Sequence, residues 1–349
     1  MNSELQDLPC NKYGGYSDKH QAVIFIVCLM IQYQIETRQA DLEDTSLWDE
    51  HIDVEQLLDK DPRAAYRSGA VDALQTKIIR HCRPVIERFG LKSQDKARTL
   101  DEYHRMPTCR LRLTQVDGQI QPLVVSGPVS DGWGPNGLHA TNFTNIHVPD
   151  GIAYHPSTDL WIQLDDDLLP PFIRGEIKST DGKRYFFKPN DTDEQFLRET
   201  NILLKIFELG LARKIRTSNI AALVYTDDRT NIIGVLIEWN DARQIGDMMK
   251  TATHDDLARW KTQVLQSVEK LHQNEIVWGD VNLGNILIDA DSNAWVVDYG
   301  GLYNPRFVDE ENCETKVGDL QGVQRVFAHL AWEIDNRLTG ASDGAFNHS

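Results

Sequence analysis

The sequence contains few cysteines, and their spacing fits neither a metal site nor a disulfide framework. The 349 residues include five, Cys10, Cys28, Cys82, Cys109 and Cys313, an odd number without a Cys-x-x-Cys pair. A structural zinc site and a secreted disulfide scaffold both require closer, paired cysteines. We therefore expect reduced thiols, which are typical of a cytoplasmic protein.

A hydrophobic run long enough to cross a membrane is also missing. The apolar run Ala22–Ile31 is shorter than the about 20 residues that a membrane-spanning helix needs. Acidic Glu4 and Asp7 precede it, which argues against a secretory signal. We interpret this run as the buried face of a helix and expect no membrane partner.

Positive charge is scarce. Lysine and arginine together number 36 against 53 aspartates and glutamates, so the formal net charge is −17. Such a protein repels nucleic acids and anionic membranes unless it carries a strong local basic patch. The densest basic cluster, Lys77, Arg80, Arg83 and Arg88, has helical spacing and is interpreted as a solvated helix face. We expect no nucleic-acid partner.

The remaining composition is that of a folded protein with more than one part. Apolar residues make up 41% and charged residues 26% of the chain, which is ordinary for a globular domain. The length exceeds a usual single domain. We expect three parts: 1–108, 109–240 and 241–349.

Residues 1–108 are expected to form a helical extension. The segments Gln21–Gln39, Val54–Leu58 and Val71–Phe89 carry apolar residues at approximate helical spacing, and Pro84 predicts a kink. No residue pattern in this part indicates chemistry.

The two later parts differ in their periodicity. Residues 109–240 read as strands with one helix, beginning with a hairpin around Asp117-Gly118. After residue 240 the pattern is mostly helical. The expected elements are strands Cys109–Val116, Ile120–Val125, Leu160–Leu164, Ile173–Lys178, Arg184–Phe187, Ile220–Tyr225 and Ile232–Glu238, helix Asp193–Leu209 closed by Gly210, helix His254–Gln273, strands Asn285–Ile288 and Ala294–Val297, and a helix near Asp319–Arg337. This order predicts an α+β fold with a strand-rich lobe and a short helical lobe.

Three polar residues in the last third of the chain are expected to converge. Two short apolar strands separated by residues 289–293 form a hairpin, with Asn285 at its entry and Asp298 at its exit. An amide oxygen and a carboxylate side by side are ligands that suit Mg²⁺. Asp280 precedes Asn285 across a tight loop and can face the same site as a base or an orienting acceptor.

The pattern Asp280-x-x-x-x-Asn285 followed by Asp298-Tyr299-Gly300 resembles the catalytic loop and the metal-binding DFG motif of the protein-kinase-like superfamily. The segment GDVNLGNILI is especially similar to phosphotransferases of the aminoglycoside and choline type and to divergent kinase-like proteins of filamentous fungi. The resemblance implies a two-lobed protein-kinase-like fold, ATP and Mg²⁺ as cofactors, and a small molecule or a protein as the hydroxyl acceptor.

The same resemblance implies residue roles. Asp280 would orient or deprotonate the acceptor hydroxyl, while Asn285 and Asp298 would hold the metal. Lys188, at the end of a strand, would bind the nucleotide phosphates and pair with Glu199 on the following helix. The alternative for Glu199 is an ordinary surface position on the helix edge.

A nucleotide-binding hinge is expected in the strand that ends the middle part. Leu236, Glu238 and Asn240 lie in this stretch, and its backbone would contact the adenine. Leu236 and Ile237 equally suit the core of a sheet. Asp319 resembles the helix aspartate that braces the catalytic loop.

Several positions depart from the family pattern. Trp278 and Gly279 stand where a His-Arg pair is usual, and Asn282 stands where a lysine is usual. The acidic stretch Asp165–Asp167 replaces a glycine-rich loop. Two alternatives therefore stay open: a pseudokinase or scaffold that binds but does not catalyse, and a kinase fold that performs nucleotidyl or acyl transfer. The sequence predicts no oligomeric state.

Overall fold

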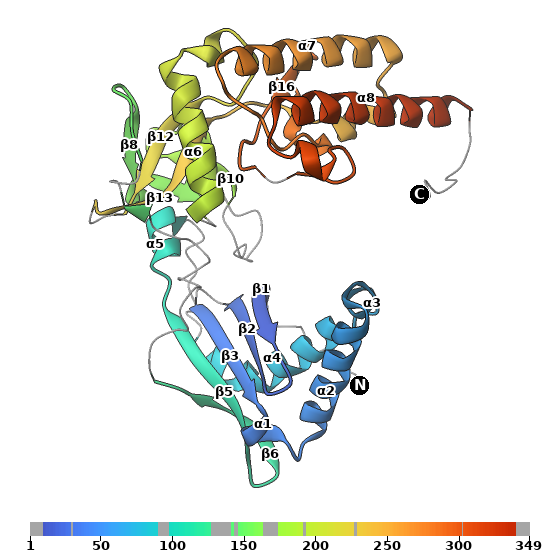
Figure 1. The fold of residues 1–349 in the computed structure, drawn as a ribbon. Helices are drawn as coiled ribbons and strands as arrows, with labels where there is room; N and C mark the ends of the chain where they lie inside the picture. The colour runs from blue at the N-terminus through green and yellow to red at the C-terminus, as the bar shows by residue number, and fades with distance from the viewer. Residues whose placement is uncertain are drawn as a thin grey trace. The chain divides into compact units, whose positions relative to one another are not determined.

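The chain forms two compact units, each with its own hydrophobic core. Unit 1 comprises Met1–His139 with Ser157–Gly182, and unit 2 comprises Ala140–Pro156 with Lys183–Ser349. The computed structural model describes residues 10–28, 31–89, 98–126, 141–142, 146–162, 174–190, 193–226, 229–301 and 303–339 (Figure 1).

Unit 1 is built on a five-stranded sheet in the order β1-β2-β3-β5-β6. Neighbouring strands are antiparallel except β3 and β5, which are parallel. Helices connect β3 to β5 and pack against one face of the sheet (Figure 1). The elements are β1 Cys10–Ser17, β2 Gln21–Cys28, β3 Ile31–Arg38, α1 Gln39–Leu42, α2 Ser46–Lys60, α3 Pro62–Arg67, α4 Ala70–Phe89, β5 Thr108–Val116 and β6 Gln119–Val124, and a smaller sheet region adds β4 Arg98–Thr99, α5 Leu100–His104, η3 Ser157–Asp159, β9 Leu160–Ile162 and β10 Gly175–Ser179.

The helix expected at Gln21–Gln39 is wrong, because this segment contains β2 and β3. In β3 the apolar residues Ile31, Tyr33 and Ile35 alternate with polar ones, which is the period of a strand. The run that follows Gln21 is rich in β-branched residues, which favour strands, and a short buried strand cannot be told from a buried helix by hydrophobicity alone. The extension at 1–108 is therefore a mixture of strands and helices.

The other expectations for unit 1 are confirmed in part. Helices lie over Val54–Leu58 and Val71–Phe89, with Pro84 inside α4. The hairpin β5–β6 turns at Asp117 and Gly118, which both have positive φ. Because β5 pairs with β3, this sheet crosses the boundary that the sequence predicted after residue 108.

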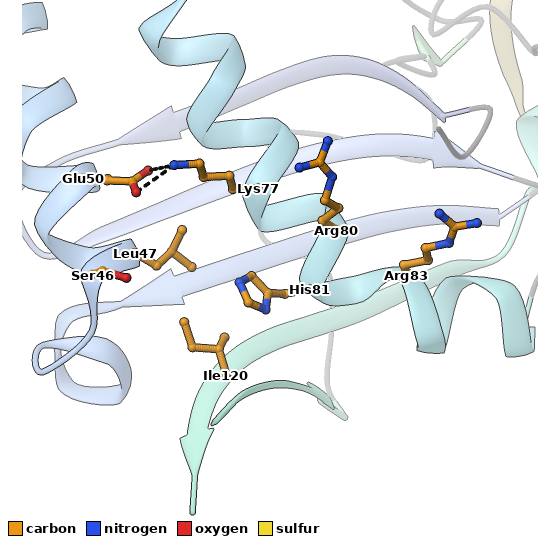
Figure 2. Close-up of a pocket in the computed structure, with 8 residues that line it drawn as sticks. All are labelled: Ser46, Leu47, Glu50, Lys77, Arg80, His81, Arg83 and Ile120. Atoms are coloured by element: carbon orange, nitrogen blue, oxygen red, sulfur yellow. Dashed lines mark hydrogen bonds and ion pairs between the residues drawn. The ribbon is translucent and has the colours of Figure 1, made fainter. Parts of the chain in front are cut away.

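The basic cluster on α4 behaves as a solvated helix face. Lys77 is paired with Glu50 of α2 at 2.6 Å, and Arg83 with Glu87 at 2.7 Å. A pocket of unit 1 lies beside these residues and is lined by both helices and by Ile120 of β6 (Figure 2).

The expectation of five reduced cysteines is wrong for Cys28 and for the cysteine bonded to it. Cys28 is disulfide-bonded, whereas Cys82, Cys109 and Cys313 are free thiols.

Unit 2 combines a sheet with a helical region. Strands β11, β13 and β12 are antiparallel, β8 runs parallel to β12, and β14, β15 and β16 form a separate small sheet. The elements are β7 Thr141–Asn142, β8 Ala153–Pro156, β11 Arg184–Pro189, α6 Asp193–Glu208, η4 Leu211–Arg213, β12 Ile220–Tyr225, β13 Asn231–Glu238, β14 Arg243–Gln244, η5 Ile245–Lys250, α7 His254–Gln273, η6 Leu283–Asn285, β15 Ile286–Ile288, β16 Ala294–Val296, η7 Glu310–Asn312 and α8 Lys316–Thr339.

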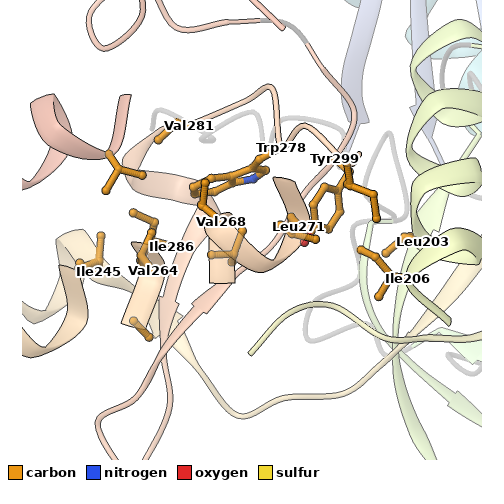
Figure 3. Close-up of a cluster of buried hydrophobic side chains, with 14 of the residues drawn as sticks. Leu203, Ile206, Ile245, Val264, Val268, Leu271, Trp278, Val281, Ile286 and Tyr299 are labelled. Atoms are coloured by element: carbon orange, nitrogen blue, oxygen red, sulfur yellow. The ribbon is translucent and has the colours of Figure 1, made fainter. Parts of the chain in front are cut away.

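The strands and helices expected for the described residues of unit 2 are confirmed within a few residues. Gly210 ends α6 with φ of +59°, which is the conformation of a C-terminal glycine cap. Thr253 caps α7 by accepting a hydrogen bond from the Asp256 amide. Trp278 and Tyr299 lie in one apolar cluster with side chains of α6 and α7 (Figure 3). The core thus extends directly beneath the loop that carries Asp280.

A close approach between α8 and this loop leads to a stability prediction. A Cβ atom at Gly322 would lie 2.6 Å from Cβ of Val281. Gly322→Ala should therefore lower the free energy of unfolding by about 1–3 kcal/mol through overpacking. Urea unfolding measures this change.

The matched control is Gly246→Ala in η5, where a Cβ atom meets no other atom within 4 Å. This variant should be neutral or slightly stabilised, because alanine restricts the unfolded chain. Equal effects of the two substitutions would contradict the close packing of α8 against the Asp280 loop.

Candidate active site

A buried lysine forms the centre of the site in unit 2. Lys188, near the end of β11, is 7% exposed, and its Nζ contacts the carboxylate of Glu199. Its distance to Oδ1 of Asp298 is 3.0 Å. One ammonium group therefore joins a strand, a helix and the segment after β16.

Glu199 reaches this lysine because of its place on α6. It lies three residues after Phe196 and four before Leu203, both of which are buried. Glu199 itself is 8% exposed, so the alternative of a surface position is wrong. Its carboxylate also accepts the backbone N–H of Tyr299 at 3.2 Å. A buried carboxylate with an ammonium and an amide donor is a satisfied one.

The loop before β15 presents Asp280 between two asparagines. Asn282 donates to Oδ1 of Asp280 at 2.9 Å, and Asn285 donates to Oδ2 at 2.8 Å. Asn282 also accepts the Gly284 N–H at 2.8 Å, which fixes the turn. Both carboxylate oxygens of Asp280 are therefore held in defined directions.

The β15–β16 hairpin brings Asn285 next to Asp298, as the sequence predicts. The Val297 N–H donates to the Asn285 carbonyl at 3.1 Å. Asp298 has a φ of +66°, a left-handed conformation that few non-glycine residues adopt. The side-chain nitrogen of Asn285 is used by Asp280, so its amide oxygen is the atom suited to a cation.

The donor set fits a magnesium ion held together with phosphate. Glu199, Asp280 and Asp298 carry three formal negative charges against the single positive charge of Lys188, a net of −2. Mg²⁺ is commonly bound through one or two carboxylates plus substrate phosphates and water. Within the described residues no group of three or more His, Cys, Asp or Glu side chains forms an all-protein metal site.

The pKa of Asp280 is raised above its ordinary value. Burial is the main cause, and the negative charge of Asp298 adds to it. The hydrogen bonds from Asn282 and Asn285, and the charge of Lys188, act in the opposite direction. A carboxyl group with a raised pKa suits a proton acceptor that works near neutral pH.

Asp319 of α8 braces the loop from below. Its carboxylate accepts the N–H groups of Trp278 and Gly279, each at 2.8 Å, and contacts Nε2 of His272 at 2.7 Å. Trp278 in turn donates from its indole to the carbonyls of Val297 and Asp298, both at 3.0 Å. The residue that replaces the usual histidine therefore links the Asp280 loop to Asp298.

The expected hinge residues occupy the end of β13. Leu236 is fully buried and pairs with Phe187 of β11, which favours the sheet-core alternative for its side chain. The Glu238 N–H donates to the Asn219 carbonyl at 2.9 Å, and the Asn240 carbonyl accepts the Ala242 N–H at 2.8 Å. Their role in nucleotide binding stays a prediction, as do the other catalytic and cofactor roles.

The sequence predicts no role for Arg198 in the site. Arg198 contacts the Tyr299 carbonyl, and the only sequence signal for it was the missing arginine at Gly279. The acidic stretch Asp165–Asp167 lies outside the described residues.

Residues 176–319 match the family model described as the protein kinase domain. Similar segments occur in serine/threonine-protein kinase pakG of Dictyostelium discoideum, 27% identical over 97 residues, and in mitogen-activated protein kinase kinase kinase dlk-1 of Caenorhabditis elegans, 25% identical over 109 residues. These segments cover 27% and 30% of this chain, and 8% and 12% of the two relatives.

Residues 176–319 of the chain are therefore similar to the protein kinase domain. The expected fold class, α+β of the protein-kinase-like type, is confirmed, except that the N-terminal extension contains a sheet. The chain spans only a small part of the length of the relatives it matches. No helix among the described residues is long and apolar enough to cross a membrane.

The contacts of Asp280 lead to a prediction about its titration. Asn282→Asp keeps an oxygen for the Gly284 N–H, but it replaces a donor to Asp280 with a negative charge. The pKa of Asp280 should rise by about one unit, because the hydrogen bond that lowers it is lost and a like charge is added. An NMR titration of the Asp280 carboxyl carbon measures this.

Asn231→Asp is the control, because it makes the same charge change away from Asp280. Asn231 begins β13, four residues before Val235, which pairs with Lys188. This variant should leave the Asp280 titration unchanged. A pKa that stays the same in Asn282→Asp would contradict the loop geometry.

Proposed function

We propose that this protein is an ATP- and Mg²⁺-dependent phosphotransferase that transfers a phosphoryl group to a hydroxyl of a small molecule or a protein. The observation that supports this proposal is the pairing of the buried Lys188 ammonium with the carboxylates of Glu199 and Asp298. The Asp280–Asn285 pair lies on the adjoining loop. These charges are suited to binding phosphate, to binding a metal ion and to accepting a proton.

Each side chain has a distinct task in this proposal. ATP with Mg²⁺ would supply the phosphoryl group and much of the positive charge that stabilises its transfer. Lys188 would bind phosphate oxygens, and Glu199 would keep its ammonium in place. Asn285 and Asp298 would hold the metal. Asp280 would accept the proton of the acceptor hydroxyl, for which its raised pKa is suitable.

The adenine is proposed to bind at the end of β13. Because the Glu238 amide donates to the Asn219 carbonyl, the Glu238 carbonyl and the Asn240 amide are the backbone groups we assign to the base. We propose no nucleic-acid or membrane partner, since the formal charge of −17 disfavours polyanions.

Labelled ATP tests the function directly. Purified protein is incubated with Mg²⁺, γ-labelled ATP and either a metabolite extract or a mixture of proteins. Label on a metabolite or a protein supports the proposal and identifies the acceptor class. Nucleotide binding without transfer would instead support a pseudokinase, and transfer from α-labelled ATP would support nucleotidyl transfer.

The metal assignment predicts a loss of nucleotide binding. Asp298→Asn and Asn285→Ala should each abolish the thermal stabilisation that ATP gives in the presence of Mg²⁺. For a ligand at about 100 times its Kd, this stabilisation is about 2.7 kcal/mol. Asp291→Asn, an exposed charge in the turn of the same hairpin, is the control and should respond to ATP normally. Undiminished stabilisation by ATP in both site variants would contradict the metal assignment.

The base assignment predicts a loss of turnover without a loss of binding. Asp280→Ala should retain nucleotide binding, because its carboxylate acts on the acceptor. The transfer rate should fall by about 10²–10⁴, the usual contribution of a positioned acid or base. Binding titrations and single-turnover kinetics separate the two effects. Full turnover in this variant would show that Asp280 is structural.

A further inference from the structure

Arg198 connects three parts of unit 2 that the sequence separates widely. It lies on α6, directly before Glu199. Its guanidinium donates to the backbone carbonyl of Tyr299, the residue after Asp298. Its Nε lies 3.5 Å from the carboxylate of Glu314, in the segment that leads into α8.

The guanidinium also occupies the space beside two glycines. A Cβ atom at Gly279, next to Asp280, would overlap the Arg198 guanidinium. A Cβ atom at Gly301 would lie 3.0 Å from Cδ of Arg198 and 2.6 Å from the carboxylate of Glu314. Both glycines have positive φ, +85° and +80°. The backbone on either side of the site is therefore shaped to admit this arginine.

Glu314, which makes this contact, has an unusual backbone conformation. Its φ is +54°, which is uncommon for a residue with a side chain. Its side chain is 48% exposed, whereas that of Arg198 is 22% exposed. Another acid of the segment, Asp309, is already paired with Arg325 at 2.6 Å. Within the described part of the segment, Glu314 is thus the carboxylate that reaches Arg198.

We propose that Arg198 and Glu314 form a latch that keeps the site assembled without phosphorylation. Arg198 is a positioning residue: it holds the Tyr299 backbone, and so keeps Asp298 and Glu199 on Lys188. Glu314 supplies the negative charge that draws the segment 303–315 onto α6. The latch rests on the proposed function for its effect on phosphoryl transfer, but its structural effect does not depend on that function.

The hydroxyl groups of the segment support a carboxylate latch over a phosphate. The side chain of Thr315 donates to the Asn312 carbonyl at 2.8 Å and accepts the Gly318 N–H at 3.0 Å. A phosphate there would break the start of α8. Tyr303 is half-buried against the core, so adding a charge of about −1.5 to −2 would cost burial energy.

Hydrogen exchange tests the latch independently of catalysis. The Tyr299 N–H donates to Glu199, and the Gly300 N–H donates to Asp298 at 3.3 Å, so their exchange rates report whether both carboxylates stay in place. The variants are Glu314→Lys, Arg198→Met and the double substitution. Glu310→Lys is the control, because it makes the same charge change at an exposed residue of the same segment.

Glu314→Lys should speed exchange at these two amides about tenfold, because a repulsive pair replaces an attractive one. Arg198→Met should have at least as large an effect, since it also removes a charged donor from the Tyr299 carbonyl. The double variant should match Arg198→Met within about twofold, and Glu310→Lys should match the unaltered protein. Normal exchange in Glu314→Lys, or an undiminished effect of that substitution when Arg198 is absent, would overturn the latch.

Transfer kinetics then tests the link to function. In the same variants kcat/KM should be lowest where hydrogen exchange is fastest. Phosphatase treatment of the unaltered protein should change neither kcat/KM nor the exchange rates. Changed exchange with unchanged turnover would overturn the positioning role alone. If no transfer occurs in any sample, the proposed function fails, while the exchange measurements still decide on the latch.

Discussion

The site depends on the buried ammonium group of Lys188. Removing a charge from water costs several kcal/mol unless opposite charges and hydrogen bonds replace the solvent. Here Glu199 comes from α6 and Asp298 follows β16, so satisfying one lysine brings a helix and a hairpin to β11. Loss of either carboxylate would leave the lysine under-compensated. The same contacts that stabilise the charge therefore define the geometry of the site.

Asp319 organises the backbone of the site, as Lys188 organises its charged side chains. Helix α8 brings one carboxylate beneath the loop, where it accepts two consecutive N–H groups, those of Trp278 and Gly279. The Trp278 indole then reaches the carbonyls next to Asp298. Bonds of this type carry no catalytic role, but they fix the direction in which Asp280 points. A core of α7 and α8 side chains lies beneath them.

The sequence predicts the local parts of this arrangement well and the long-range parts poorly. Asp280, Asn285 and Asp298 lie on one loop and one hairpin, so their spacing alone brings them together. Glu199 was placed by the apolar period of its helix. The run Ala22–Ile31 is predicted as a helix but forms strands, because a short, buried, β-branched segment satisfies helix and strand patterns equally. Its assignment depends on strand partners up to residue 112, which local patterns do not reveal.

Arg198 illustrates how a departure from a motif can be misleading. From the sequence, Gly279 is a position where a family arginine is missing, and this loss argues against activation by phosphorylation. In the structure the space beside Gly279 is filled by the guanidinium of Arg198, and Asn282, which stands in place of a lysine, anchors Asp280 instead. Positive charge is thus present beside the loop, but it comes from the helix that carries Glu199. Because Arg198 and Glu199 are neighbours on α6, Glu314 contacts the residue next to the partner of Lys188.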